Sequence, residues 1–419
     1  MNVKISTQDA VYEGFLVQED GEYVVLKLSS GYNVGIRKDS ITSQEELSSE
    51  PTLTPDFPAI PFNDQLQTVH IIHTGGTIAS KIDYKTGGVF ADFTPERLVA
   101  LFPELNDLAN ITTTFVGNMF SDDFRFAHFN KIITAIQEAM DAGVKKIIVT
   151  SGTDFLHYLS AGLSFICKDA DVSLLVVGSQ RSSDRPSSDA GMNLICATTF
   201  LMKTDFTGVG VCMHETTNDD SCIILPGVNI RKMHSSRRDA FKALNTKPLA
   251  SVDYLTKEVT LHQPVSSSAS KSNKPLGRFN EELKIGMLLS HPNMFAQEIE
   301  HFSSFDGVVV LGSGLGHLPA SVIDEHTTEH GVIYSVLLTL AKNIPVVMST
   351  QCLYGQTHLQ VYSQGRRLQE LGIYGHESFM SPETTYMKLA YLLSTNQDLS
   401  LLETNMCGEQ NSERWNDEY

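Results

Sequence analysis

Two glycine–threonine motifs and one basic segment hold the side chains best suited to chemistry. The first motif is HTGGTIAS at 73–80, in which Thr77 follows two glycines. Glycine permits positive φ and a close approach of the backbone, so amide N–H groups can converge on a ligand oxygen beside the Thr77 hydroxyl. This pattern favours a nucleophile next to an oxyanion-binding pocket. Taken alone, a tight strand-to-loop turn explains it equally well, whereas a phosphate loop is disfavoured because no Gly-Lys-Ser or Gly-Lys-Thr follows.

The second motif, SGTD at 151–154, places the Thr153 hydroxyl directly before the carboxylate of Asp154. We expect a helix to begin here. Threonine and aspartate are both common helix caps, so capping is the simpler interpretation of this motif alone. It becomes a candidate for chemistry only in the company of the other clusters.

The basic segment NIRKMHSSRRDAF at 229–241 supplies candidate bases. A lysine that is buried beside a carboxylate and a hydroxyl can lose its proton, whereas an arginine cannot. The candidates are therefore Lys232 and His234. A solvated basic face or a phosphate-binding patch is the alternative interpretation of the same segment.

The elements that must position these clusters are strands of an α/β sheet. From residue 68 onward, apolar stretches such as TVHIIH and KKIIVT alternate with helical periods such as KIITAIQEAMDAG. This alternation predicts a parallel sheet with helices on its faces, because parallel strands need long crossovers. The ligand crevice of such a sheet lies at the carboxyl ends of its strands, and the polar clusters at 73–80, 150–157 and 178–193 all follow predicted strands.

Changes in composition divide the chain into segments. Alternating strands and turn signals near the start predict a small N-terminal β-barrel, and a Ser-, Pro- and acid-rich linker follows it that cannot bury enough apolar surface to fold alone. A second, Ser- and Lys-rich break separates two α/β regions. We expect a β-barrel at 1–43, a linker at 44–66, a large α/β domain with the active site at 67–262, a linker at 263–281, and a smaller α/β domain with a C-terminal tail at 282–419.

Composition limits the classes of function. A net charge of −18 over 419 residues argues against a surface that attracts nucleic acid everywhere, because phosphate contacts depend on Lys and Arg. The six cysteines show no CxxC spacing, so they do not predict a zinc site. No apolar run approaches the ~18 residues that span a bilayer, and the first residues carry charges where a secretion signal has apolar side chains. We therefore expect a cytoplasmic protein.

Taken together in this order, TGGTIA, SGTD and the downstream lysine resemble the L-asparaginase and glutaminase family. The resemblance covers about 69–394 and includes FVGNMFSDDF at 115–124, which is similar to the family's serine-containing substrate loop. It implies a two-domain α/β fold of the asparaginase type, with parallel sheets flanked by helices, that hydrolyses side-chain amides. The leading β-domain and the segment RKMHSSRRDAF at 231–241 narrow the resemblance to the D subunits of archaeal glutamyl-tRNA(Gln) amidotransferases.

The resemblance also implies roles for individual residues. Thr77 is the implied nucleophile, and a second set combines a hydroxyl, a carboxylate and an amine. The substrate-binding residues would comprise a backbone oxyanion donor, two groups that hold the α-amino and α-carboxylate end, and a tyrosine on a mobile loop. The implied catalytic residues are Thr77, Thr153, Asp154 and Lys232, and the implied substrate-binding residues are Gly76, Ser121, Asp122 and Tyr84.

The family role implies partners. Ammonia from glutamine would pass to the E subunit of the amidotransferase (GatE), which uses ATP and Mg²⁺ to activate and amidate Glu-tRNA(Gln); this chain itself would need no cofactor or metal. We expect the partner to hold most of the tRNA, and a homodimer core within a heterotetramer. A free-standing cytoplasmic L-asparaginase and a non-catalytic scaffold with the same fold are the alternatives. The sequence departs from the family pattern at Glu215, Gln356 and His358, and these departures bear on contacts at the partner or subunit interface.

Overall fold

The computed structural model describes most of the chain. Three residues that the sequence implicates in the site, namely Thr77, Gly76 and Tyr84, lie outside the described part. The described residues are 2–8, 10–19, 21–28, 33–47, 62–75, 81–82, 89–90, 98–99, 101–181, 183, 187–265 and 274–410.

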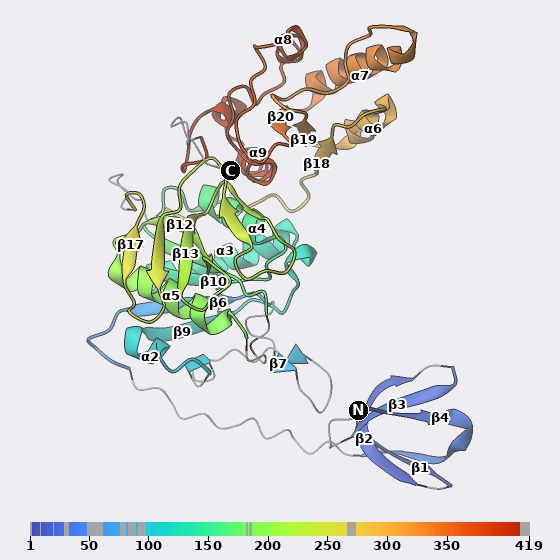
Figure 1. The fold of residues 1–419 in the computed structure, drawn as a ribbon, viewed down its shortest axis with the longest axis vertical. Coiled ribbons are helices and arrows are strands. Elements are labelled where there is room, and N and C mark those ends of the chain that lie inside the picture. Colours follow the sequence, from blue (N-terminus) through green and yellow to red (C-terminus); the bar gives the residue numbers. More distant parts are fainter. Residues whose placement is uncertain are drawn as a thin grey trace.

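The N-terminal unit is a five-stranded antiparallel sheet with the order β4-β3-β2-β1-β5 (Figure 1). One face carries a small apolar core that includes Val3, Ile5 and Leu26. The sequence predicts this β-rich unit correctly, although a pairing of β4 with β5 that closes a barrel is not among those of the described residues. Its elements are β1 (Asn2–Thr7), β2 (Val11–Glu19), β3 (Tyr23–Leu28), β4 (Asn33–Arg37), the short 3-10 helix η1 (Lys38–Ser40) and β5 (Ile41–Glu46).

An eight-stranded sheet of order β17-β16-β13-β12-β11-β10-β6-β9 forms the large domain. The five strands from β9 to β12 are parallel, as predicted, and β13, β16 and β17 extend the sheet in antiparallel fashion. The strands are β6 (Thr68–His73), β9 (Asn110–Phe115), β10 (Lys146–Thr150), β11 (Ser173–Val177), β12 (Gly208–His214), β13 (Ser221–Pro226), β16 (Ala250–Asp253) and β17 (Val259–Leu261). A separate two-stranded pair is formed by β7 (Lys81–Ile82) and β8 (Val89–Phe90).

Helices cover both faces of this sheet because successive strand residues point to opposite sides (Figure 1). Ile72 and Val149 belong to one core with α3 (Phe126–Asp141) and α4 (Leu156–Ile166). Ile71 and Ile148 belong to the other core with α2 (Leu105–Leu108) and α5 (Ala190–Lys203). Burial on both sides explains the nearly continuous apolar strands, and it holds the carboxyl ends of β6, β10 and β11 at one edge.

The small domain is built on the parallel sheet β18-β19-β20. Its last helix, α9, packs against α4 of the large domain, where a Cβ at Gly162 would lie 2.6 Å from Met387 Cε. Gly162 thus lets the two helices approach closely. The elements are β18 (Ile285–Leu289), α6 (Ala296–Glu300), η3 (His301–Ser304), β19 (Gly307–Gly312), η4 (Glu325–Thr327), α7 (Glu329–Asn343), β20 (Val346–Thr350), α8 (Ser363–Glu370), α9 (Pro382–Ser394) and η5 (Leu399–Glu403). Among the described helices, none is long and apolar enough to cross a membrane.

Candidate active site

The glycine motif after β6 is fixed by a close backbone approach. Gly75 has φ +112°, and a Cβ there would lie 2.3 Å from the amide nitrogen of Met119. No other residue fits this position without moving the 116–120 loop. The preceding Thr74 is fully buried and donates its hydroxyl to the carbonyl of Thr150 at 2.8 Å, so it is a structural residue that joins β6 to β10.

A hydroxyl, a carboxylate and an amine meet at the carboxyl end of β10. Lys232 Nζ donates to Thr153 Oγ1 at 2.8 Å and to Asp154 Oδ1 at 2.9 Å. The lysine side chain is 10% exposed, and that of Asp154 is 67% exposed. The structure therefore brings together three of the four residues that the sequence implicates in catalysis, and the fourth, Thr77, lies outside the described residues.

Helix capping, the simpler interpretation of SGTD, is wrong. Helix α4 begins at Leu156 and its N-cap is Phe155, so neither Thr153 nor Asp154 caps it. The Phe155 amide instead donates to Ser121 Oγ at 3.1 Å. The hydroxyl and the carboxylate before the helix are thereby left for Lys232.

Ser121 and Asp122, the predicted substrate-binding pair, lie in the short helix η2 (Ser121–Asp123). Ser121 is 1% exposed, and a Cβ at Gly152 would lie 3.1 Å from its Oγ, so the η2 loop packs closely on the loop that precedes α4. Asp122 is exposed to solvent. Ser121 therefore contacts the 151–155 loop, and Asp122 follows it in the same short helix.

Lys232 ends β14 (Ile230–Lys232), which pairs with β15 (Phe241–Ala243) in a hairpin. The other candidate base, His234, is exposed, and its Nδ1 accepts from the amides of Ser236 and Arg237 within the turn. His234 therefore shapes the turn, and Lys232 is the candidate that contacts the threonine.

The basic segment is not a solvated cationic patch, because its arginines pair with separate acids. Arg237 binds Asp239 through two hydrogen bonds of 2.8 and 2.5 Å. Arg238 binds Asp219 and the carbonyl of Thr217. These pairs neutralise the charges that a phosphate-binding patch would need.

The base of this hairpin is held by the small domain. Asn229 has φ +53°, and its amide donates to Thr384 Oγ1 at 3.0 Å near the start of α9. Its Nδ2 donates to the carbonyl of Glu409 at 2.8 Å. Asparagine tolerates the left-handed conformation better than most residues, and here its side chain also anchors the hairpin.

Arg231, the residue before Lys232, joins a polar cluster with the buried side chains of His157 and Glu383. The carboxylate of Glu383, on α9, lies 3.4 Å from Arg231 Nε and 3.9 Å from His157 Nε2. Burial, together with the nearby charges of Arg231 and Lys232, lowers the pKa of His157 to about 4. His157 is therefore neutral near pH 7, and Arg231 is the cation that balances Glu383.

Gln180, which follows β11, also reaches the site. Its Oε1 accepts from Thr153 Oγ1 at 3.4 Å. Asp189, fully buried, holds the backbone in place by accepting from the amides of Gln180 and Arg181, each at 2.9 Å. The sequence indicates a polar cluster at 178–193 but singles out neither residue; the position of GSQ directly after a predicted strand is the signal that could have found Gln180.

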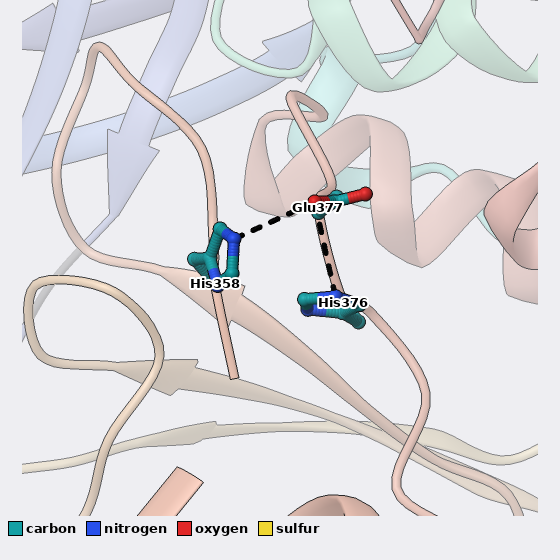
Figure 2. A group of neighbouring side chains, drawn as sticks. All are labelled: His358, His376 and Glu377. Atoms are coloured by element: carbon teal, nitrogen blue, oxygen red, sulfur yellow. Dashed lines mark ion pairs between the residues drawn. The ribbon is translucent and has the colours of Figure 1, made fainter. Parts of the chain in front are cut away.

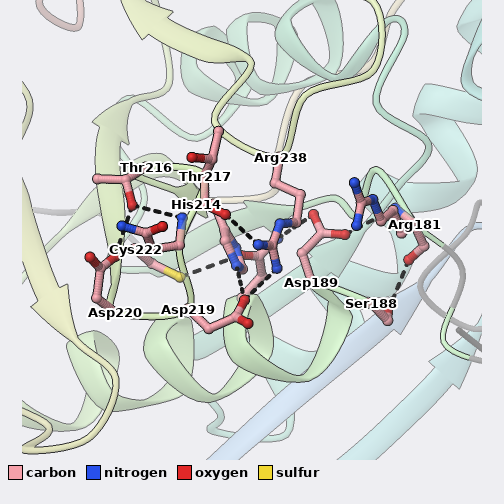
Figure 3. A network of polar contacts seen from close by, with 12 residues as sticks. Arg181, Ser188, Asp189, His214, Thr216, Thr217, Asp219, Asp220, Cys222 and Arg238 are labelled. Atoms are coloured by element: carbon pink, nitrogen blue, oxygen red, sulfur yellow. Dashed lines mark hydrogen bonds and ion pairs between the residues drawn. The ribbon is translucent and has the colours of Figure 1, made fainter. Parts of the chain in front are cut away.

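A continuous polar network joins the Gln180 loop to the end of the Lys232 hairpin (Figure 3). Asn193 Nδ2 donates to the Gly178 carbonyl at 2.9 Å, and Asn193 Oδ1 lies 2.6 Å from His214 Nδ1. His214 Nε2 lies 3.4 Å from Asp219, which Arg238 also binds. Burial lowers the pKa of His214, so its neutral ring connects the two halves without adding charge.

His358, His376 and Glu377 form a second cluster, in the small domain (Figure 2). The Glu377 carboxylate lies 3.4 Å from His358 Nε2 and 3.9 Å from His376 Nε2. His376 Nδ1, however, accepts from the amide of Leu359 at 3.2 Å. The neutral ring must then carry its proton on Nε2, the nitrogen that faces Glu377, whereas a metal requires a bare nitrogen there. We assign no metal to this cluster.

An aromatic cavity of about 460 Å³, lined in part by Phe155, lies between the two α/β domains. Tyr158, Met287 and Tyr386 are among its lining residues. Burial raises the pKa of Tyr158, so its hydroxyl stays protonated. Neither Thr153, Asp154 nor Lys232 lines this cavity, and the candidate chemistry therefore lies outside it.

Comparisons with known proteins agree with this geometry. Family models match residues 2–45 (GatD N-terminal domain), 68–266 (Asparaginase, N-terminal) and 284–406 (Glutaminase/Asparaginase C-terminal domain). The chain is 36% identical to the D subunit of the glutamyl-tRNA(Gln) amidotransferase of Methanobrevibacter smithii, over 98% of this chain and 93% of the relative. It is 37% identical to the protein of the same name from Pyrococcus horikoshii, over 96% and 91% of the two chains.

A solved structure with the same fold is the thermostable L-asparaginase from Thermococcus kodakarensis. The TM-score is 0.70 at 28% identity, and the match covers 83% of this chain and all of that one. The two α/β domains thus have the asparaginase arrangement, and the leading sheet matches the GatD N-terminal domain. The chain therefore belongs to the family of glutamyl-tRNA(Gln) amidotransferase D subunits.

Proposed function

We propose that the chain is the glutamine-hydrolysing subunit of a tRNA-dependent amidotransferase. Its ammonia would convert Glu-tRNA(Gln) to Gln-tRNA(Gln). One observation carries the hydrolytic part: Lys232 Nζ donates to both Thr153 and Asp154, which places an amine where protons must move during amide cleavage. The names of the relatives support the link to tRNA.

The proposed reaction has two steps. Thr77 Oγ1 attacks the carbon of the glutamine side-chain amide, and the C–N bond then breaks to give a threonine ester and ammonia, which takes up the threonine proton. Water next attacks the ester, releases glutamate and returns a proton to Thr77. Lys232, oriented by Thr153 and Asp154, mediates these proton transfers. Backbone amides near Gly76 and Thr153 stabilise the tetrahedral oxyanion.

The amide of Thr153 is suited to that role. It makes no hydrogen bond to any residue within the described ranges, although Thr153 as a residue is 7% exposed and its hydroxyl takes part in two hydrogen bonds. An N–H group that is held rigidly and left unpaired costs free energy until a ligand oxygen binds it. Asp122 is the exposed carboxylate that we assign to the substrate's α-amino group, and Ser121 supports it from the buried side of η2.

The partner supplies the other half of the reaction. We assign ATP and Mg²⁺ to the E subunit (GatE) and no metal or cofactor to this chain. Two of the hairpin arginines, Arg237 and Arg238, are paired with acids, and the net charge is −18, so most tRNA contacts belong to the partner. A homodimer core within a cytoplasmic heterotetramer completes the proposal.

Replacing Thr77 with valine tests the nucleophile. Valine keeps the shape of threonine but lacks the hydroxyl, so we expect ammonia release from glutamine by the complex to fall by at least ~10²-fold. Thr77→Ser is the matched control, because it keeps a hydroxyl at the same carbon and should retain most of the turnover. Turnover near that of the wild type in a folded Thr77→Val protein would remove Thr77 from the mechanism.

A further inference from the structure

One polar group beside the proposed catalytic set has no partner. Gln180 Nε2 is buried and makes no hydrogen bond to any residue that the structure describes. A buried amide donor without a partner destabilises the free enzyme, because it has lost its hydrogen bonds to water without replacing them. Gln180 as a residue is half-buried, but its Nε2 atom is buried, and its backbone amide is held by the buried carboxylate of Asp189.

The orientation of the Gln180 amide follows from the hydrogen bonds around Thr153. Lys232 Nζ donates to Thr153 Oγ1 at 2.8 Å, so the threonine hydroxyl must send its own proton elsewhere. Gln180 Oε1, at 3.4 Å, is the acceptor. The carbonyl end of the amide therefore faces Thr153, and the NH₂ end is the free one.

Two hydrogen-bond donors at Thr153 and Gln180 are thus unpaired among the described residues. The amide N–H of Thr153 and the Nε2–H of Gln180 both lack partners within the described ranges. The two donors are linked, because the Thr153 hydroxyl donates to the carbonyl oxygen of the Gln180 side chain. Donors that are fixed in a water-poor site and left unsatisfied in the free enzyme are the arrangement that stabilises developing negative charge. The only species in the proposed reaction that gains such charge is the oxygen of the glutamine side-chain amide.

We propose that Gln180 contacts the substrate and donates its Nε2–H to the oxygen of the scissile amide, alongside the backbone donors of the site. This inference rests on the proposed hydrolysis and extends it, because it assigns a substrate contact to a residue outside the family motifs TGGT and SGTD. No bond to Gln180 forms or breaks. Its contribution is electrostatic, and Thr153 keeps the carboxamide in the correct orientation.

Two replacements of Gln180 separate this role from a structural one. Gln180→Met keeps an unbranched side chain of similar length and removes the donor, and we expect kcat of glutamine hydrolysis to fall about 10²-fold, the loss that follows removal of one oxyanion donor. KM should change by less than about threefold, because the hydrogen bond strengthens mainly in the transition state. Gln180→Glu keeps the shape and the acceptor for Thr153 but presents negative charge to the oxyanion, so its kcat should be lower still.

A structural role predicts the reverse order. If Gln180 only filled space and satisfied Thr153, the near-isosteric Gln180→Glu would be the milder change and Gln180→Met the more severe one. Ser188→Ala serves as the matched control within the same loop, because Ser188 Oγ donates to the Arg181 carbonyl at 3.0 Å and does not contact Thr153. We expect this control to retain wild-type kcat.

The assay is ammonia release from glutamine by the reconstituted complex with its charged tRNA, and circular dichroism verifies folding. Wild-type kcat in Gln180→Met, a rise in KM alone, or a Gln180→Glu protein that is more active than Gln180→Met would each overturn the inference. Lys232→Ala is measured in parallel. If Lys232→Ala is inactive while Gln180→Met is fully active, only the role of Gln180 fails; if Lys232→Ala is also fully active, the proposed hydrolytic mechanism itself fails.

Discussion

We expect Lys232→Ala to lower ammonia release from glutamine by at least ~10²-fold, because it removes the amine that mediates proton transfer between Thr153 and the reacting groups. Thr153 and Asp154 remain in place, since both belong to the loop that leads into α4. The protein should therefore stay folded and bind glutamine. A steady-state assay of the complex should report the loss mainly in kcat.

Lys242→Ala is the matched control for this replacement. Lys242 lies on β15, in the same hairpin as Lys232, and it is exposed and pairs in register with Arg231. Loss of a lysine there changes the net charge by the same amount without touching Thr153. Equal losses in the two variants would mean that hairpin stability or overall charge matters, and would exclude a specific role of Lys232.

The second large effect concerns stability. Lys388 on α9 and Glu409 near the C-terminus form an ion pair of 2.6 Å between two side chains that are fully buried. Breaking a buried pair costs about 3–5 kcal/mol, because it leaves one charge without a partner. We therefore expect Glu409→Leu to lower the thermal unfolding midpoint by several degrees, more than a typical surface replacement.

A double replacement tests whether the loss of stability comes from the charge that is left unpaired. Lys388→Met/Glu409→Leu puts apolar side chains of similar volume in place of both ions, and such exchanges are often nearly neutral. It should recover much of the stability that Glu409→Leu loses, and together with the two single variants, Lys388→Met and Glu409→Leu, it gives the coupling free energy. A double variant as unstable as the sum of the single ones would show that the two charges act independently.

This ion pair also bears on the active site. Burial lowers the pKa of Lys388, and Glu409 partly offsets that effect by favouring the charged amine. The Glu409 carboxylate accepts from the amides of Met406 and Cys407, while its backbone carbonyl accepts from Asn229 Nδ2 at 2.8 Å. The C-terminal segment thus holds the base of the Lys232 hairpin, so activity in Glu409→Leu should be lost at a lower temperature than in the wild type.

The sequence predicts the parallel sheet well because apolar runs on β6, β10 and β11 are buried on both faces and alternate with helical periods. The meeting of Thr153 with Lys232, over 70 residues apart, could be anticipated only from the family resemblance. Periodicity places each motif at the end of a strand, but it cannot tell which side chains then touch. It also could not separate Lys232 from His234, since that depends on the turn formed after β14.

Long-range polar contacts are what the sequence leaves out. Asp189 is one of several aspartates and serines in its loop, so its sequence does not distinguish it. Only the structure shows that its carboxylate accepts from the amides of Gln180 and Arg181 and holds their backbone in place. The capping interpretation of SGTD fails for a related reason. Helix α4 begins at Leu156, beyond Thr153 and Asp154, at a position set by the contact of Phe155 with Ser121.

The structure shows the surroundings of two of the residues that depart from the family pattern, Glu215 and His358. Glu215 accepts from the hydroxyls of Ser221 and Ser251, at 2.7 and 2.8 Å, so its carboxylate is satisfied within the large sheet. His358 lies in the small-domain cluster with His376 and Glu377, and no hydrogen bond or ion pair among the described residues joins it to Thr153 or Lys232. Neither residue alters the proposed catalytic set.

The measurement that tests the central claim most directly is ammonia release by the purified chain, first alone and then with the ATP-using partner, glutamine and Glu-tRNA(Gln). We predict little hydrolysis of glutamine or asparagine by the chain alone, and rapid release of ammonia with formation of Gln-tRNA(Gln) once partner and charged tRNA are present. Brisk asparagine hydrolysis by the chain alone, unchanged by partner and tRNA, would contradict the account and identify a free-standing asparaginase.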